Sequence, residues 1–255
     1  MNNTQPQSAP LLKQLTHLSR EDERNATLMH NLRNEAASLV KKSGQPTDYI
    51  ALGTIDTLLN APVRVQETFN KGLSKYPNNS QLMGYYAVSL DKLGFVGKAM
   101  DYGQRAYEMH QGDLFLLNHQ IEHCINAGHL RTAQHWLTQW QHLQPNKPHK
   151  YGDFVEKAVK LLQQSDVFDD AVEEFVQLSF AVLHDDGIYY TLTRDYRLRQ
   201  DECSVKWITY EIELPCPVGK NVDLMVELAD RFVETDLDLR LDIDKVLVRY
   251  TSRKH

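Results

Sequence analysis

The spacing of hydrophobic and polar residues changes along the chain at Asp185-Asp186-Gly187. Before this point the hydrophobic positions follow a helical period, as in the stretch from Phe154 to Leu162. After it, hydrophobic and polar residues alternate, which is typical of half-buried strands. The pattern predicts an α+β protein with a helical domain over 19–184 and a small α+β module over 185–255.

A repeat of 34 residues runs through the helical part. Gly94-Phe-Val-Gly-Lys-Ala99 is followed 34 residues later by Gly128-His-Leu-Arg-Thr-Ala133, with glycine and alanine at the same offsets. A further step back gives a third unit, so the repeats cover 46–79, 80–113 and 114–147. A fixed period of this length predicts stacked helical hairpins, an architecture that usually binds other proteins.

The small residues and prolines of the units have physical roles at these positions. Gly94 and Gly128 fall where the chain leaves one helix through a left-handed conformation, which glycine adopts without steric cost. Pro77 and Pro145 end the second helix of their units, because proline cannot continue a helix.

On these residues the units resemble the tetratricopeptide repeat. The matching positions are Leu52-Gly53, Phe69 and Pro77 in the first unit, Ala87, Gly94, Ala99 and Ala106 in the second, and Gly128, Ala133 and Pro145 in the third. The chain departs from the family pattern at Asp56, Leu90, Cys124 and Val65. The resemblance implies an all-α array of helical hairpins with a concave groove.

Both ends of the array are expected to be atypical, since terminal repeats have one face in water. Ala171 and Phe175 repeat the second-helix pattern after a slip of four residues, which suggests a degenerate fourth hairpin over 150–184. Ahead of the array, Ser19 and Asp22 form a capping-box pattern for a helix that runs through Lys42. Residues 1–18 are expected to be a flexible tail.

The module after residue 187 is expected to order its elements as strand, strand, helix and strand in an antiparallel sheet. The hydrophobic positions of the three strands are Ile188, Tyr190, Leu192, Tyr196 and Leu198, then Ile208, Tyr210, Ile212 and Leu214, then Leu237, Leu239, Leu241 and Ile243. Asn221 caps the predicted helix Val222 to Val233. Its apolar stripe is Val222, Met225, Val226, Ala229 and Val233. Because so small a module buries little apolar surface by itself, we expect it to pack on the last helix of the array.

Composition narrows the function classes. The chain has 255 residues, 42% of them hydrophobic and 24% charged, with a formal net charge of −6. These values are ordinary for a globular protein, and the acidic balance argues against nucleic acid as the partner.

No 18-residue window is apolar and uncharged, so no membrane span is expected. The polar N-terminus does not have the pattern of a signal peptide, and Cys124, Cys203 and Cys216 form no CxxC pair, which favours a reducing cytoplasm.

The resemblance implies that side chains of the first helices line the groove. In this register they are Thr47, Ile50, Thr54, Gln81, Tyr85, Val88, Lys92, Asn118, His119 and Glu122. We expect Tyr85 to be the main anchor, since aromatic side chains dominate interface energetics. The prediction is a non-enzymatic, cofactor-free adaptor or chaperone-like protein, in a prokaryotic cytoplasm, that binds a protein or peptide segment. In the alternatives, the C-terminal module is an enzyme or nucleic-acid binder recruited by the array, or the array self-associates.

Three other constellations carry weaker signals. His119, Glu122 and His123 resemble the inverted zinc motif of pitrilysin-type metallopeptidases, but they lie in the first helix of a repeat within a histidine-rich stretch, so ordinary groove histidines are favoured and no metal site is predicted. Basic and aromatic residues interleave over 189–207 as on a single-strand nucleic-acid surface, although strand packing favours the same residues. The row Asp236, Asp238, Asp242 and Asp244 has two interpretations, a cation site or a charged exposed strand that discourages edge-to-edge aggregation. The second interpretation is favoured.

Overall fold

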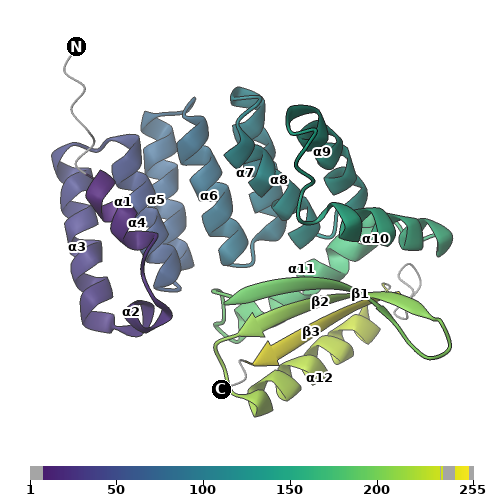
Figure 1. The fold of residues 1–255 in the computed structure, drawn as a ribbon. Helices are drawn as coiled ribbons and strands as arrows, with labels where there is room; N and C mark the ends of the chain where they lie inside the picture. Colours follow the sequence, from purple (N-terminus) through teal and green to yellow (C-terminus); the bar gives the residue numbers. More distant parts are fainter. Residues whose placement is uncertain (1–7, 236, 238–244, 253–255) are drawn as a thin grey trace.

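The computed structural model describes residues 8–235, 237 and 245–252 (Figure 1). The helices of this part are α1 (Ala9–Leu15), α2 (Arg20–Arg24), α3 (Ala26–Lys42), α4 (Pro46–Leu58), α5 (Pro62–Lys75), α6 (Ser80–Lys92), α7 (Val96–Met109), α8 (Leu114–Asn126), α9 (Leu130–Leu143), α10 (Gly152–Gln164), α11 (Asp169–Asp185) and α12 (Val218–Glu234). The strands are β1 (Thr193–Gln200), β2 (Lys206–Leu214) and β3 (Val246–Ser252). The predicted class, an all-α array followed by a small α+β module, is confirmed.

The array keeps the 34-residue period of the sequence. The first helices α4, α6 and α8 begin at Pro46, Ser80 and Leu114, and the second helices α5, α7 and α9 begin at 62, 96 and 130. Within each pair the two helices pack on each other, and α6 packs on both α4 and α8. Figure 1 shows these helices as a row above the sheet.

The two turn glycines of the repeat have the predicted left-handed backbone, with φ of +80° at Gly94 and +88° at Gly128. Both also lie against α11. A Cβ at Gly128 would come within 2.9 Å of the backbone of Val172 and Glu173, and one at Gly94 within 2.5 Å of the Phe180 ring. The repeat turns therefore form a seat for α11 that has no room for a side chain.

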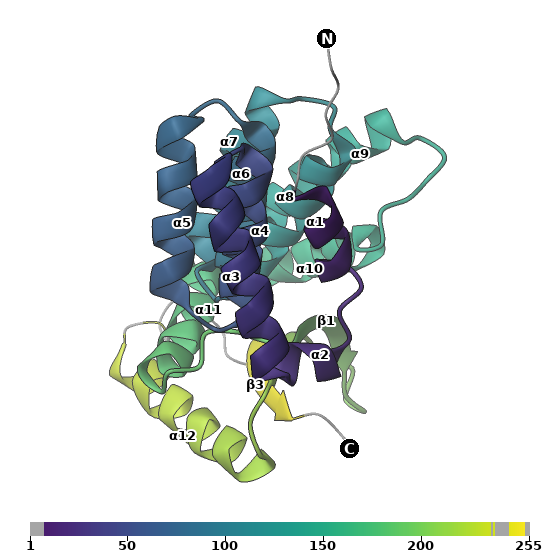
Figure 2. The same ribbon diagram turned by 90° about the vertical axis from the view of Figure 1, so that its left-hand side faces the viewer.

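The N-terminal segment differs from the predicted flexible tail over 1–18. Residues 1–7 are outside the described part, but α1 is a helix that packs on α4 with Leu11 only 2% exposed. Figure 2 shows α1 on the side of α4 that faces away from α5. The apolar pair Leu11 and Leu12 accounts for this docking, because both contact the core around α3 and α4.

The capping box of Ser19 and Asp22 is confirmed, but it begins a helix of five residues. A second cap ends that helix: the side chain of Asn25 accepts a hydrogen bond from the Leu28 amide at 3.0 Å and starts α3. The predicted continuous helix through Lys42 is therefore two helices, since Asn25 competes for the backbone amides at that point.

The last two helices of the array separate instead of forming a regular hairpin. Helix α10 packs on α9, β1 and β2, whereas α11 packs on α12, β3 and α7. The sheet lies against both of them, so the predicted packing of the module on the last array helix is confirmed. The side chains that the sheet buries against these helices include Ile208, Ile212 and Val248.

The sheet is mixed, which corrects the antiparallel sheet of the prediction. Its order is β1-β2-β3, with β1 antiparallel to β2 and β3 parallel to β2. The parallel pairing follows from the crossover through α12 between β2 and β3. The predicted third strand over 237–243 and the aspartate row lie, except for the buried Leu237, outside the described residues. The sequence prediction missed β3, seven residues that start at Val246.

Helix α12 begins at Val218 after Pro217, four residues before the predicted start. Its buried residues are Asn221, Leu224, Leu228 and Phe232, and the predicted apolar stripe is exposed except for the half-buried Met225. The Phe232 ring packs on Phe175 of α11 at 5.0 Å between centroids. Leucine and phenylalanine bury more apolar area than valine, which explains why this face was selected. Asn221 does not cap the helix; its Nδ2 donates to Ser252 Oγ at 2.7 Å and joins α12 to β3.

Across the part of the chain with described coordinates, none of the helices is both long and apolar enough to cross a membrane.

Candidate functional site

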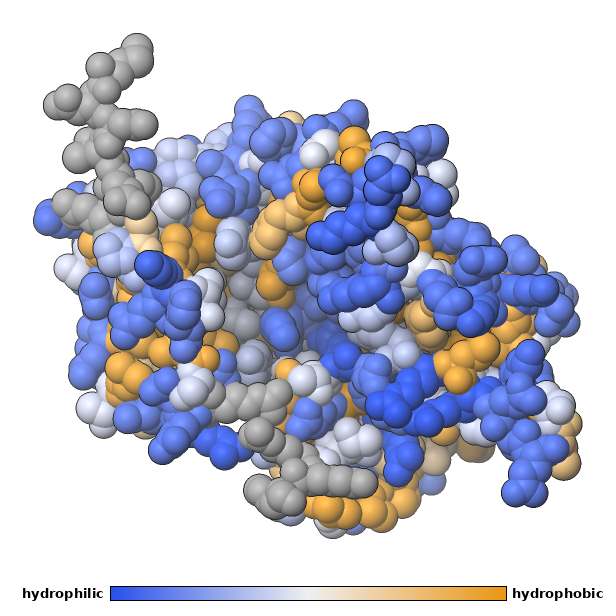
Figure 3. All heavy atoms as spheres, viewed as in Figure 1, coloured by the Kyte–Doolittle hydropathy of each residue, from blue (hydrophilic) through white to orange (hydrophobic). Residues whose placement is uncertain are grey.

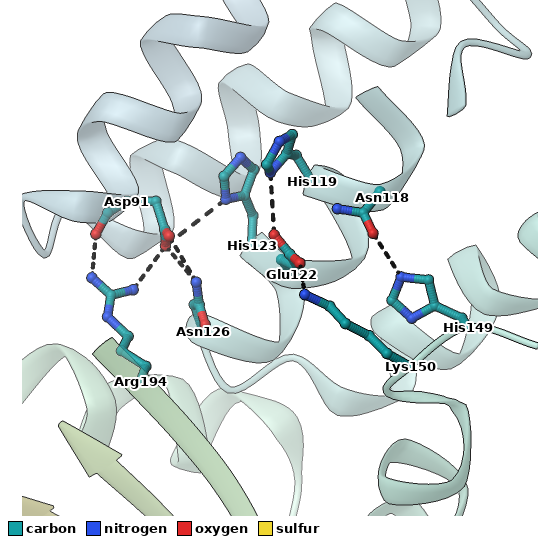
Figure 4. A network of polar contacts seen from close by, with 9 residues as sticks. All are labelled: Asp91, Asn118, His119, Glu122, His123, Asn126, His149, Lys150 and Arg194. Atoms are coloured by element: carbon teal, nitrogen blue, oxygen red, sulfur yellow. Dashed lines mark hydrogen bonds and ion pairs between the residues drawn. The ribbon is translucent and has the colours of Figure 1, made fainter. Parts of the chain in front are cut away.

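A cavity of about 190 Å³ lies where the first helices of the array meet β1. It is lined by Val88, Asp91 and Lys92 from α6, by His119, Glu122, His123 and Asn126 from α8, by Lys150 and Tyr151, and by Thr191, Thr193, Arg194 and Tyr196. The lining thus joins segments that are about 100 residues apart in sequence. Figure 3 shows hydrophilic residues where the array meets the sheet, and Figure 4 shows the polar contacts inside this junction.

Asp91, in the last turn of α6, is the centre of the first network (Figure 4). Arg194 Nη1 donates to its Oδ1 at 2.9 Å, and Arg194 Nη2 donates to its backbone oxygen. Asn126 Nδ2 lies 2.9 and 2.7 Å from the two carboxylate oxygens. Burial would raise the pKa of the Asp91 carboxyl, but the Arg194 charge, the neighbouring His123 and the Asn126 hydrogen bonds outweigh it and hold the pKa well below its usual range. Asp91 is therefore ionised at neutral pH.

Glu122 is the centre of the second network. Its Oε2 lies 3.2 Å from His119 Nδ1, and Lys150 Nζ is 2.6 Å from its Oε1. Burial opposes ionisation, but hydrogen bonds with His119 and Lys150 lower the pKa of Glu122 to about 2. Both carboxylates of the cavity are thus charged and engaged by neighbours.

A third contact holds the segment between α9 and α10 onto α8. His149 Nε2 donates to Asn118 Oδ1 at 3.0 Å, while His149 Nδ1 accepts from the Tyr151 amide at 3.3 Å. This pairing requires the neutral ring, and burial lowers the pKa of His149 in agreement with it. The His149 ring also packs against Trp140 at 4.9 Å between centroids.

A row of rings leads from the array surface to the cavity. Tyr85 and Phe115 lie 5.4 Å apart between ring centroids, Phe115 and His119 4.4 Å, and His119 and His123 6.1 Å. Phe115 is 41% exposed, whereas His123 is 1% exposed. We call these four residues the ring row; its outer end is open to solvent and its inner end lies in the cavity wall.

Two groups in the cavity have unused binding capacity. Neither ring nitrogen of His123 has a hydrogen-bond partner, and its Nδ1 is 3.8 Å from Asp91 Oδ1. Lys92 is exposed and forms no ion pair within the described ranges, although Lys150 and Arg194 each pair with a carboxylate. Buried polar groups are nearly always hydrogen-bonded, so a histidine in the cavity wall whose one polar contact in the described chain is the long pair with Asp91 has room for a hydrogen bond with a ligand group.

The ten groove residues predicted from the sequence divide into two groups. Val88, Lys92, His119 and Glu122 line the cavity, Tyr85 belongs to the ring row, and Asn118 binds His149. The other four lie away from the cavity. Ile50 is buried at 1% exposure within the core, Thr47 and Thr54 are half-buried, and Gln81 is exposed.

The weaker constellations are arranged differently from the patterns that suggested them. His119 and Glu122 contact each other while His123 turns toward Asp91, and no three His, Cys, Asp or Glu side chains of the described chain converge as metal ligands. On the sheet, Arg197 and Arg199 pair with Glu211, whereas Arg194 is drawn into the cavity. The basic and aromatic residues of 189–207 therefore do not form one surface.

Sequence reasoning missed the parts of the cavity that come from outside the repeat register. Asp91 and Asn126 lie at helix positions next to predicted groove residues, and a wider helical face would have included them; His123 was considered only as part of the zinc motif. Phe115, in the first turn of α8, could have been found from the sequence, because an aromatic residue four positions before His119 lies on the same face of the helix. Arg194 could not, because only the folded chain brings it to Asp91.

Comparisons with known proteins identify no relative. No protein-family model, curated protein or solved structure matches the chain.

Proposed function

We propose that the protein is a non-enzymatic adaptor or chaperone-like scaffold that binds a segment of another protein on the concave side of a tetratricopeptide-like array. The observation that carries the proposal is the ring row, which joins the exposed Phe115 to the buried His123 in the cavity wall. An aromatic pair with one exposed and one half-buried ring, beside a polar cavity, is typical of an anchor site for a peptide side chain.

The charges of the cavity indicate which segment fits. Three cationic side chains and two carboxylates line it, and both carboxylates are paired, so Lys92 provides the uncompensated charge. A segment with an apolar side chain on Tyr85 and Phe115 and an acidic side chain near Lys92 would satisfy both features. Because Asp91 and Glu122 already pair with neighbouring side chains, these two carboxylates hold the cavity in shape for a bound segment.

Affinity capture from the native host tests this proposal. We expect a partner that co-purifies with the wild type and is reduced at least tenfold with Tyr85→Ala/Phe115→Ala, because aromatic anchors contribute about 2 kcal/mol or more. Lys92→Glu should weaken capture and reduce its salt dependence.

Val63→Ala is the matched control, because Val63 is 68% exposed on α5, the second helix of its pair. A partner that is retained by the ring-row variant and lost with the control would contradict the proposal, provided that circular dichroism shows both variants folded.

A further inference from the structure

Helix α12 has a second apolar face that nothing in the described chain covers. Val218, Val222, Val226 and Val233 are 68, 57, 56 and 76% exposed. Their spacings of four, four and seven residues place them on one side of the helix, together with the exposed Ala229. We call these five residues the valine stripe. Figure 3 shows an apolar patch at the lower edge of the molecule, where Figure 1 places α12.

The stripe is separate from the face that holds α12 in the fold. Leu224, Leu228 and Phe232 are at most 4% exposed and pack toward α11 and β3. Single exposed valines are normal on protein surfaces, but a continuous row along a helix of 17 residues is typical of a contact surface.

One edge of the valine stripe is acidic. Asp223, Asp230 and Glu234 each follow a stripe residue by one position and are exposed, so they share one side of the stripe. The other edge carries Met225, which is half-buried and contacts the core of the module. A partner that lies on the valine stripe therefore meets negative side chains along one edge of the stripe. Along the other edge it meets the surface of the module.

This one-sided charge selects between occupants. In an antiparallel two-fold pair of α12 helices the same edge of each copy meets, which would bring the two acidic rows together at a cost in free energy. An anionic membrane surface is repelled for the same reason. A helix with an apolar face and lysine or arginine along one edge complements both features.

We propose that the valine stripe of α12 is a docking surface for an amphipathic α-helix of another protein that carries basic residues along one edge. This surface is distinct from the ring row and the cavity, and the proposal does not depend on the proposed function of the array. It gives the C-terminal module a binding role of its own.

Two synthetic 18-residue helical peptides test the proposal on the full chain. They share a leucine and valine stripe, and one has lysine and the other glutamate at the edge positions. Fluorescence anisotropy should show binding of the lysine peptide, at least about tenfold weaker binding of the glutamate peptide, and a loss of affinity with added salt.

Two variants and a control make the test specific to α12. Val222→Gln/Val226→Gln should weaken binding of the lysine peptide at least about tenfold, because two valines that the peptide would cover are lost while glutamine keeps the helix. Asp230→Lys/Glu234→Lys should reverse the preference between the peptides. Val63→Gln, an exposed valine on α5, should leave binding unchanged.

Absence of lysine-peptide binding, equal affinity for both peptides, or binding that is unaffected by Val222→Gln/Val226→Gln overturns the proposal. So does concentration-dependent dimerisation of the wild type that the same variant abolishes, because it would assign the stripe to a second copy of the chain. Circular dichroism of each variant confirms that the fold is kept.

Discussion

At the residue scale, the ion pair of Asp91 and Arg194 has the largest consequences. The side chains are 13% and 9% exposed, and the pair joins α6 of the array to β1 of the module. Charges out of contact with water are tolerated only when they are paired and hydrogen-bonded, and here Asn126 completes the set. The pair also forms one wall of the cavity, so stability and site geometry depend on the same contact.

Removal of one partner tests this role. Arg194→Met should lower the free energy of unfolding by about 3–5 kcal/mol, because it leaves the Asp91 carboxylate buried without its cation. The double variant Asp91→Asn/Arg194→Met should recover part of the loss. Urea unfolding of the wild type, Asp91→Asn, Arg194→Met and the double variant measures the coupling, and strictly additive losses would show that the pair is not energetically linked.

The neutral His149 predicts a pH dependence. Burial lowers the pKa of His149 from its ordinary value of 6.5, so the folded chain takes up this proton less readily than the unfolded chain. The free energy of unfolding should therefore fall as the pH drops below about 6.5, whereas Glu122, whose pKa is lowered from 4.5 to about 2, adds to the loss only as the pH approaches its ordinary value of 4.5.

Thermal unfolding between pH 7.5 and 5 measures this dependence. His149→Gln, which can still donate to Asn118, should give a shallower loss of stability than the wild type. Some loss should remain, since burial lowers the pKa of His184 as well. An unchanged slope in the variant would assign the acid sensitivity to other groups.

At the scale of elements, the repeat turns are specified by two requirements at once. Gly94 and Gly128 need a positive φ, and both lie too close to α11 for a side chain. Gly112 has the same conformation, with φ of +92°, but no atom lies within 4 Å of a Cβ placed there. Gly94 and Gly128 therefore allow the turns of two neighbouring hairpins to pack directly on α11.

Comparison of two substitutions separates these requirements. Gly112→Ala should cost about 1–2 kcal/mol, from the left-handed backbone alone. Gly128→Ala should cost clearly more, because the new Cβ must also displace the backbone of α11 at Val172 and Glu173. Chemical unfolding measures both, and equal losses would mean that the contact with α11 yields without strain.

The elements also show which information the sequence carries. The hairpins were predictable because glycine, alanine and proline recur at fixed offsets that have local causes, and their helices begin at Pro46, Ser80 and Leu114. The buried face of α12 was not, because the helix has two apolar faces and the packing of Leu224, Leu228 and Phe232 in the folded core decides which one is covered. Likewise, β3 depends on pairing with β2, and Arg194 reaches Asp91 only through the fold.

At the scale of the whole molecule, the array and the module build one site together. The side chain of Asn60 accepts hydrogen bonds from the amides of Tyr189 and Tyr190, and His184 Nε2 donates to the Leu93 oxygen at 2.8 Å. These contacts hold the chain that leads into β1 against the array, so that the strand closes the cavity at the end of the ring row. The groove of the array and the charges of the module therefore belong to the same proposed binding surface.

Site-specific cross-linking in the native host tests this central claim most directly. A photo-reactive phenylalanine analogue in place of Phe115, at the exposed part of the ring row, should give a discrete adduct with a partner protein, and the same analogue in place of Val63 should give none. The adduct should disappear when Lys92→Glu is added, because the cavity charge is part of the surface. An adduct only at position 63, or one at position 115 that is indifferent to Lys92, would contradict the account.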